Sequence, residues 1–207
     1  MEELSTSLAP TRRRRLPAVA VVYGWAVAAS LAAVAPFAAV YTLVVQLPNG
    51  VVRRASMDGW GRDHPDQALQ FYGHDVRFGI ALWVCGLGLI AVAAFCILVV
   101  RARRPADAAV LGRPAMIAAI AAPCLLAGVV GTLVLSAQSY VDGIDAISAD
   151  RQAGLTAGEA VYQAGYGAGV WLSLAALVVA LLSSYVFLRR LLSEPLGDRA
   201  GLDAVGP

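Results

Sequence analysis

Long apolar runs alternate with short polar segments along the chain, and the length of these runs is the first strong signal. Four of them reach or exceed about 20 residues, the length that a helix needs to cross the hydrocarbon core of a bilayer. They cover residues 17–47, 78–100, 114–137 and 165–188, and none contains Asp, Glu, Lys, Arg or His. This pattern predicts an all-α membrane protein: a four-helix transmembrane bundle made of two consecutive helical hairpins.

The polar segments between the runs complete the predicted domain organisation. They are a basic tail at 1–16, a first outer loop at 48–77, a basic linker at 101–113, a second outer loop at 138–164 and a tail at 189–207. Because each pair of spans returns the chain to its starting side, we expect both tails and the linker on one side of the membrane. Both loops are then expected on the other side.

The distribution of arginine predicts which side is which. All sixteen basic residues are Arg, and blocks of them lie in the first tail, in the linker and at the start of the last tail. The positive-inside rule places such blocks in the cytoplasm. The first outer loop also carries four Arg, but the second carries only Arg151. We therefore expect both termini in the cytoplasm. The Arg-only composition, rich in Ala, Val and Gly, is typical of a GC-rich genome, so the expected location is a bacterial cytoplasmic membrane.

Small residues recur at the spacing of one helical turn in three of the runs, which allows helices to approach closely. The candidate helix-packing residues are Gly24, Ala28, Ala32, Gly128, Thr132, Gly165, Gly169 and Ser173. The pair Gly165 and Gly169 serves either packing inside the bundle, which we favour, or a homodimer. Pro36 and Pro123 are candidate kinks, and Pro48-Asn49-Gly50 is a turn that ends the first helix.

The first outer loop is the one place where chemistry-bearing side chains gather. Imidazole beside carboxylate suits a divalent metal and also serves acid–base catalysis. Four side chains are candidate metal ligands: His64, Asp66, His74 and Asp75. Their spacing fits no metal motif, so we favour a local interpretation, a surface helix over 65–72 with Asp63 or His64 at its start. In the second loop, Thr156 and Glu159 have the spacing of a capping box that would begin another short helix.

The absence of ionisable groups from the runs disfavours proton-coupled transport, which uses such groups at membrane depth. It equally disfavours a membrane cytochrome, whose haem needs axial ligands. The net charge of +2 is too small to imply nucleic acid, and apart from the candidate metal no cofactor is expected.

Three functions remain in competition. The favoured one is a non-catalytic accessory or assembly subunit of a larger membrane complex, because it requires no motif. The first alternative is a small transporter or lipid-handling protein without intramembrane charges, dimeric through Gly165 and Gly169. The second alternative is an outward-facing metal or acid–base site on His64 and His74. The expected partners are the lipid bilayer and either other membrane protein subunits or a second copy of the chain.

Overall fold

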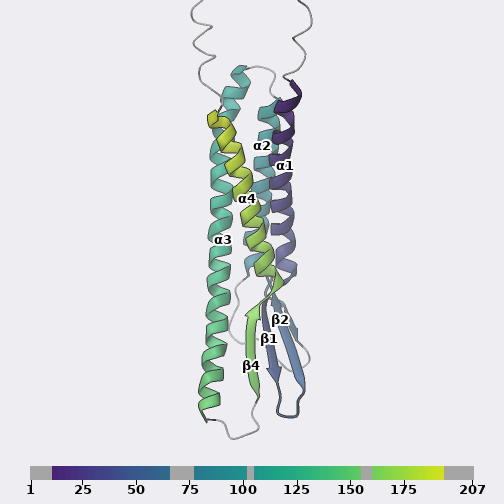
Figure 1. The fold of residues 1–207 in the computed structure, drawn as a ribbon, viewed down its shortest axis with the longest axis vertical. Coiled ribbons are helices and arrows are strands. Elements are labelled where there is room, and N and C mark those ends of the chain that lie inside the picture. The colour runs from purple at the N-terminus through teal and green to yellow at the C-terminus, as the bar shows by residue number, and fades with distance from the viewer. Residues whose placement is uncertain (1–10, 66–76, 102–104, 155–159, 194–207) are drawn as a thin grey trace, which may run out of the picture.

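The protein is mostly helical, with a small β-sheet at one end of its long axis (Figure 1). The structure, a computed structural model, describes residues 11–65, 77–101, 105–154 and 160–193. Four of its helices are long and apolar enough to span a membrane, as the hydrophobic runs predict. The sheet, however, shows that the all-α prediction was wrong.

The helices are α1 (Thr11–Val34), α2 (Phe78–Arg101), α3 (Pro105–Gly154) and α4 (Ala168–Ser193). Helix α1 packs against α2 and α4, and α3 packs against the same two helices from the other side. The start of α1, the end of α2, the start of α3 and the end of α4 all lie at the end away from the sheet (Figure 1). We call this the terminal end and the opposite one the sheet end.

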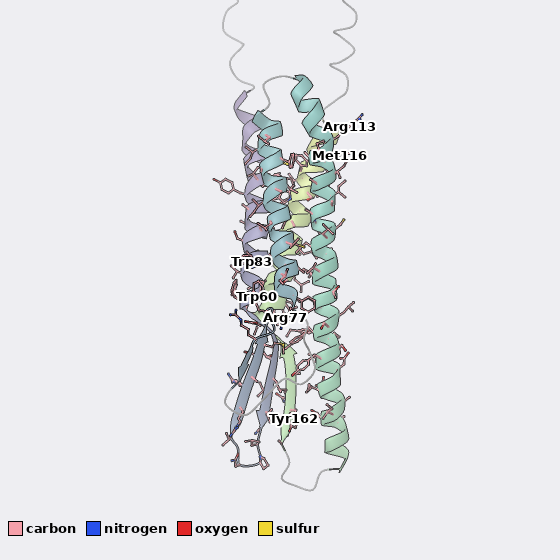
Figure 2. The ribbon with its side chains drawn as sticks, turned by 180° about the vertical axis from the view of Figure 1, so that it is seen from behind. Trp60, Arg77, Trp83, Arg113, Met116 and Tyr162 are labelled. Carbon is pink, nitrogen blue, oxygen red and sulfur yellow. The ribbon has the colours of Figure 1, made fainter. Side chains whose placement is uncertain are left out.

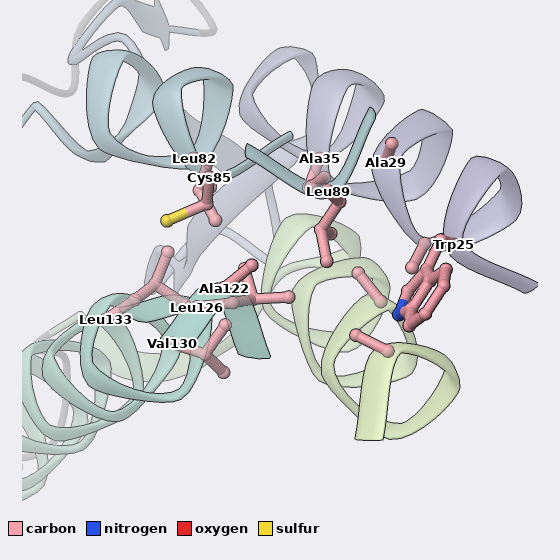
Figure 3. Packing of buried hydrophobic residues seen from close by; sticks show 14 of the residues in the cluster. Trp25, Ala29, Ala35, Leu82, Cys85, Leu89, Ala122, Leu126, Val130 and Leu133 are labelled. Atoms are coloured by element: carbon pink, nitrogen blue, oxygen red, sulfur yellow. The ribbon is translucent and has the colours of Figure 1, made fainter. Parts of the chain in front are cut away.

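The core between the helices is built from small and branched side chains. Trp25 of α1, Leu89 of α2, and Leu126 and Leu133 of α3 are completely or almost completely buried (Figure 3). The indole N–H of Trp25 donates to Ser184 Oγ at 3.3 Å, which supplies an acceptor for the one polar atom of this large side chain. A buried donor without such an acceptor would cost about 1–3 kcal/mol.

The outer surface of the helices is apolar too. Large side chains that point away from the core include Ile117, Leu125, Leu135 and Leu182, and Leu135 is 72% exposed. A water-soluble protein rarely exposes a continuous apolar surface of this kind, whereas a lipid environment accepts it. The helical part is therefore apolar inside and outside, which indicates a membrane protein.

The sheet has four antiparallel strands in the order β3-β2-β1-β4. The strands are β1 (Ala39–Gln46), β2 (Val52–Asp58), β3 (Asp63–Pro65) and β4 (Val161–Tyr166). Strand β1 occupies the centre and pairs on one side with β2, the next strand in sequence. On its other side it pairs with β4, which enters the sheet after two further helices have been formed.

The first predicted span extends too far at its C-terminal end, by about three and a half helical turns. Helix α1 stops at Val34, a 3-10 turn covers Ala35–Phe37, and residues 39–46 are strand β1 and not helix. Pro36 has no backbone N–H to continue the helix. The sequence after it is rich in Val, Tyr and Thr, which favour a pleated strand. Pro36 therefore ends the helix where we predicted a kink.

The third predicted span is too short at both ends. Helix α3 covers 50 residues, against the predicted 114–137, and continues through Pro114 and Pro123. It includes most of the predicted linker (101–113) and more than half of the predicted second outer loop (138–164). At about 1.5 Å per residue it is about 75 Å long, more than twice the hydrocarbon thickness. Its excess length runs beside the sheet (Figure 1).

Of the remaining predicted elements, one helix is confirmed, two are corrected, and parts of others lie outside the described residues. Helix α2 matches the predicted span 78–100 almost to the residue. Gly165 lies in β4 and not in a helix, so the fourth span begins at Ala168. The predicted surface helix over 65–72 does not start at Asp63 or His64, because both lie in β3. The rest of that helix, and the capping box of Thr156 and Glu159, lie outside the described residues.

Candidate interaction surface at the sheet end

The two faces of the sheet differ in character, because side chains alternate between them along each strand. One face carries Tyr41, Leu43 and Val45 of β1, all buried, together with Ala55 and Met57 of β2. The register places Tyr162, Ala164 and Tyr166 of β4 on that same face. This face belongs to the core of the protein.

The opposite face of the sheet is more open. Val44 lies at its centre, directly between Arg54 of β2 and Gln163 of β4. Arg54, Gln163 and Gln46 are exposed, and Val44 is half-buried. We call this the open face and define it by Thr42, Val44, Gln46, Arg54, Ser56 and Gln163. It is a mixed polar surface around an apolar centre, which resembles the composition of many transient protein interfaces.

Helix α3 covers the buried face and joins it to the helices. The hydroxyl groups of Tyr41 and Ser136 lie 2.8 Å apart, and the rings of Tyr41 and Tyr140 are in contact with centroids at 5.0 Å. Tyr166 donates a hydrogen bond to the side chain of Gln138. Burial raises the pKa of Tyr41 above its ordinary value of 10.0, and the bond to Ser136 offsets part of that shift. The phenol is therefore neutral at physiological pH.

Each edge of the sheet is partly protected against pairing with another strand, although β3 covers only residues 55–57 of β2. Along the β4 edge, Ser148 of α3 donates to the backbone carbonyl of Tyr162 at 3.0 Å. The other edge is β3, which is only three residues long and ends in Pro65, a residue that cannot donate a backbone hydrogen bond. Short edges, proline and a covering helix are the usual means by which proteins prevent edge-to-edge association.

A tight turn links β2 to β3 and touches the start of α2, where the backbone N–H of Gly79 donates to the carbonyl of Gly59 at 2.7 Å. One carboxylate oxygen of Asp58 accepts hydrogen bonds from the backbone N–H groups of Trp60 and Arg62, both at 2.9 Å. Gly61 has a φ of 75°, a conformation that glycine adopts without strain. Asp58 is buried, so its role is to shape this turn and to hold Trp60 in place.

Three aromatic rings meet where the turn touches the helices. Trp60 lies 5.7 Å from Phe37 and 5.9 Å from Trp83 between ring centroids, and Phe37 and Trp83 are 6.3 Å apart. We call these three residues the aromatic cluster; Figure 2 shows Trp60 and Trp83 at the junction of helices and sheet. Trp83 donates to the carbonyl of Ala33 at 3.0 Å. The indole nitrogen of Trp60 is covered and has no partner among the described groups, so its ring contacts must outweigh that cost.

The candidate metal ligands are not brought together by any described part of the chain. His64 is in β3 with its backbone paired to Ser56, and its side chain lies outside the described residues, as do Asp66, His74 and Asp75. Among the described residues, no group of three or more His, Cys, Asp or Glu side chains has the arrangement of a metal site. The metal hypothesis therefore stays a prediction from sequence.

Several of the predicted packing residues lie at real helix contacts. Ala28 and Ala32 of α1 are completely buried, and a side chain on Gly24 would collide with Ser183 of α4. A methyl group on Gly169 would lie 2.9 Å from the carbonyl oxygens of Ala35 and Ala38. Each of these glycines and alanines thus allows two segments of the same chain to approach closely.

The other predicted packing residues are placed differently. Ser173 is completely buried and donates to the carbonyl of Gly169, whereas Gly165 lies in β4 opposite Thr42. Gly128 and Thr132 of α3 are exposed, and Thr132 bonds back to the Gly128 carbonyl. These last two therefore lie on the outer surface of the helices that the structure describes.

The sequence did not reveal Asp58, Trp60 or the open face as features of one surface. The available signal was the order Met57-Asp58-Gly59-Trp60-Gly61, in which an Asp before two glycines favours a tight turn. A scan against protein-family models finds no matching family, and a search of curated proteins finds no match either. The function must therefore be argued from geometry.

Proposed function

We propose that the protein is a non-catalytic membrane protein that presents its open face to another protein, as an accessory or assembly subunit of a larger complex. The observation that carries this proposal is the rigid connection between the sheet and the helices. Only a short 3-10 turn separates β1 from α1, β4 leads into α4, and α3 continues along the buried face. The sheet is thus a fixed extension of the membrane helices.

Three features of the described residues support a binding role over a chemical one. The apolar runs 17–47, 78–100, 114–137 and 165–188 contain no Asp, Glu, Lys, Arg or His that could carry protons or ions. Asp58, the one buried acid among the described residues, is already used to shape a turn. The open face combines Arg54 and two glutamines with Val44, a composition suited to specific recognition.

The orientation that we propose places the terminal end in the cytoplasm and the sheet outside it. The Arg blocks at the terminal end support this orientation through the positive-inside rule. In a bacterium, the open face would then meet partners on the outer side of the cytoplasmic membrane. The alternative of a dimer formed through Gly165 and Gly169 loses support, because Gly169 packs against Ala35 of its own chain.

Site-specific photo-crosslinking tests the proposed partner contact. A photoreactive amino acid at Arg54 or Gln163, which flank Val44, should yield one adduct of defined mass with another membrane or periplasmic protein. The control position is Leu125, which is 67% exposed on α3 and should yield lipid adducts. A second change, Val44→Glu, should weaken the protein adduct by placing a charge at the centre of the face.

Two results would contradict the proposal. If Arg54 and Gln163 yield no protein adduct in cells that express the protein at its natural level, the open face is not an interface. If the adduct has twice the mass of the chain itself, the partner is a second copy, and the accessory-subunit proposal fails.

A further inference from the structure

The aromatic cluster lies at the level where the chain passes between apolar span and sheet. The first apolar span covers Ala20–Phe37 and therefore ends in the cluster. The second span begins at Phe78, directly after Arg77, and Trp83 follows one turn later. The cluster thus marks the depth at which a bilayer changes from hydrocarbon to headgroups, where tryptophan is enriched.

Two rings of the cluster face outward from the protein. Phe37 is 60% exposed and Trp83 is 44% exposed, although both also touch Trp60. The indole N–H of Trp83 is already bonded to Ala33, so the surface that it offers is mainly the apolar ring. Such a surface suits the upper part of an acyl chain.

Two exposed arginines lie directly beside this apolar surface. The backbone N–H of Arg62 donates to Asp58 and closes the turn that holds Trp60. Arg77 lies against the same turn, because its Cγ would be 3.6 Å from a Cβ atom added to Gly61. Figure 2 shows Arg77 next to Trp60 at the junction. Both arginine side chains are exposed. A guanidinium fork matches the oxygens of a phosphate group, with two parallel hydrogen bonds.

We propose that Arg62 and Arg77 bind the headgroup phosphate of an anionic phospholipid, whose acyl chains lie against Phe37 and Trp83. The apolar and cationic groups occur in the order that a phospholipid presents them, chains towards the helices and phosphate towards the sheet. A zwitterionic lipid would bring its own cation near two guanidinium groups, so a net negative lipid is preferred. This site accounts for arginines on the sheet side, and it does not depend on the proposed protein partner.

The experiment uses the full-length protein reconstituted into phosphatidylcholine vesicles with increasing amounts of phosphatidylglycerol. Tryptophan emission is measured while either lipid carries brominated acyl chains, which quench nearby indoles. Trp171→Phe serves as the common background, because Trp171 is also exposed and would add signal. Half-maximal quenching should occur at a lower mole fraction of brominated phosphatidylglycerol than of brominated phosphatidylcholine.

The test variant is Arg62→Gln with Arg77→Gln, and the matched control is Arg53→Gln with Arg54→Gln. The control removes the same charge from the same segment but in β2, away from the aromatic cluster. The test variant should lose up to about thirtyfold in its preference for the anionic lipid, the loss expected for two arginines at a charged membrane surface. The control should keep the preference of the parent.

Three results would overturn the proposal. They are equal quenching by both lipids in the parent, an equal loss in the control variant, and loss of the preference when inorganic phosphate is added, which would assign the site to free phosphate. If the double Gln variant fails to fold, Arg62→Lys with Arg77→Lys replaces it. That variant should retain the charge attraction but bind less selectively, since lysine cannot form the paired hydrogen bonds.

Discussion

The hydroxyl group of Tyr41 lies 2.8 Å from that of Ser136, and this contact joins the central strand of the sheet to the longest helix. The two residues are far apart in the sequence, in β1 and α3. Tyr41 is 1% exposed, so its ring is packed while its hydroxyl has a hydrogen-bond partner. This pair is one of the contacts that make the sheet and the helices a single rigid unit.

Replacement of Tyr41 by Phe should lower the free energy of unfolding by about 1 kcal/mol, the usual net value of one hydrogen bond. Ser136→Ala should have a similar effect, and the double variant should lose less than the sum. Thermal unfolding in detergent, followed by circular dichroism, provides the measurement. Tyr23→Phe is the matched control, because Tyr23 is 67% exposed on α1. Additive losses would show that the two hydroxyls act independently.

The raised pKa of Tyr41 predicts a stability difference at alkaline pH. A group that holds its proton more tightly when folded stabilises the fold below its unfolded pKa of 10.0, and this contribution is lost as pH rises through the folded pKa. The parent should therefore lose stability over this alkaline window more steeply than Tyr41→Phe, which cannot ionise. Unfolding free energies measured across the window test this. Identical pH profiles would contradict the assigned burial of the phenol.

Gly169→Leu should destabilise the folded chain itself, not a dimer. The new side chain would meet backbone oxygens of Ala35 and Ala38, which cannot rotate away, and overpacking of this kind costs about 1–3 kcal/mol or more. The matched control is Gly128→Leu, where a side chain meets open space. Yield and thermal stability of the purified proteins give the comparison. A Gly169→Leu protein that is stable but newly monomeric would instead support a dimer through this residue.

Cysteine labelling tests the proposed orientation. In a variant without Cys85, Cys96 and Cys124, a new cysteine at exposed Gln46 marks the sheet, and one at exposed Arg113 marks the terminal end (Figure 2). A membrane-impermeant maleimide should label Gln46→Cys in intact cells and Arg113→Cys only after permeabilisation. The reverse pattern would place the sheet in the cytoplasm.

The number and approximate position of the membrane-spanning helices could be predicted from sequence. Charged side chains are costly in hydrocarbon, so four long segments contain no Asp, Glu, Lys, Arg or His. The absence of charged residues gave the wrong end for the first helix. Residues 39–46 are as apolar as the helix before them, but they form a strand, and apolarity alone does not separate the two. The usable signals were Pro36 and the change from Ala-rich sequence to Val, Tyr and Thr.

The length of α3 could not be predicted because the helix continues beyond its apolar run. Its apolar run ends near Ala137, yet the helix continues because Tyr140, Ile144 and Ser148 recur every four residues and face the sheet. Only the position of the sheet explains why those residues are on one side. The open face was unpredictable in the same sense, since strand pairing brings its residues together. The aromatic cluster was unpredictable because its three residues come from a 3-10 turn, a loop and a helix.

The strand order β3-β2-β1-β4 also has a consequence for how the protein is made. During synthesis from the N-terminus, β1, β2 and β3 can pair as soon as they have been made. Strand β4 is synthesised only after α2 and α3. Until β4 is made, one edge of β1 has no neighbour. Until α3 is made, the buried face of the sheet also lacks the cover of that helix. The nascent protein thus passes through a stage with an open strand edge, the state most prone to wrong association. Biogenesis of this protein should therefore be most sensitive to delay during the synthesis of its third helix.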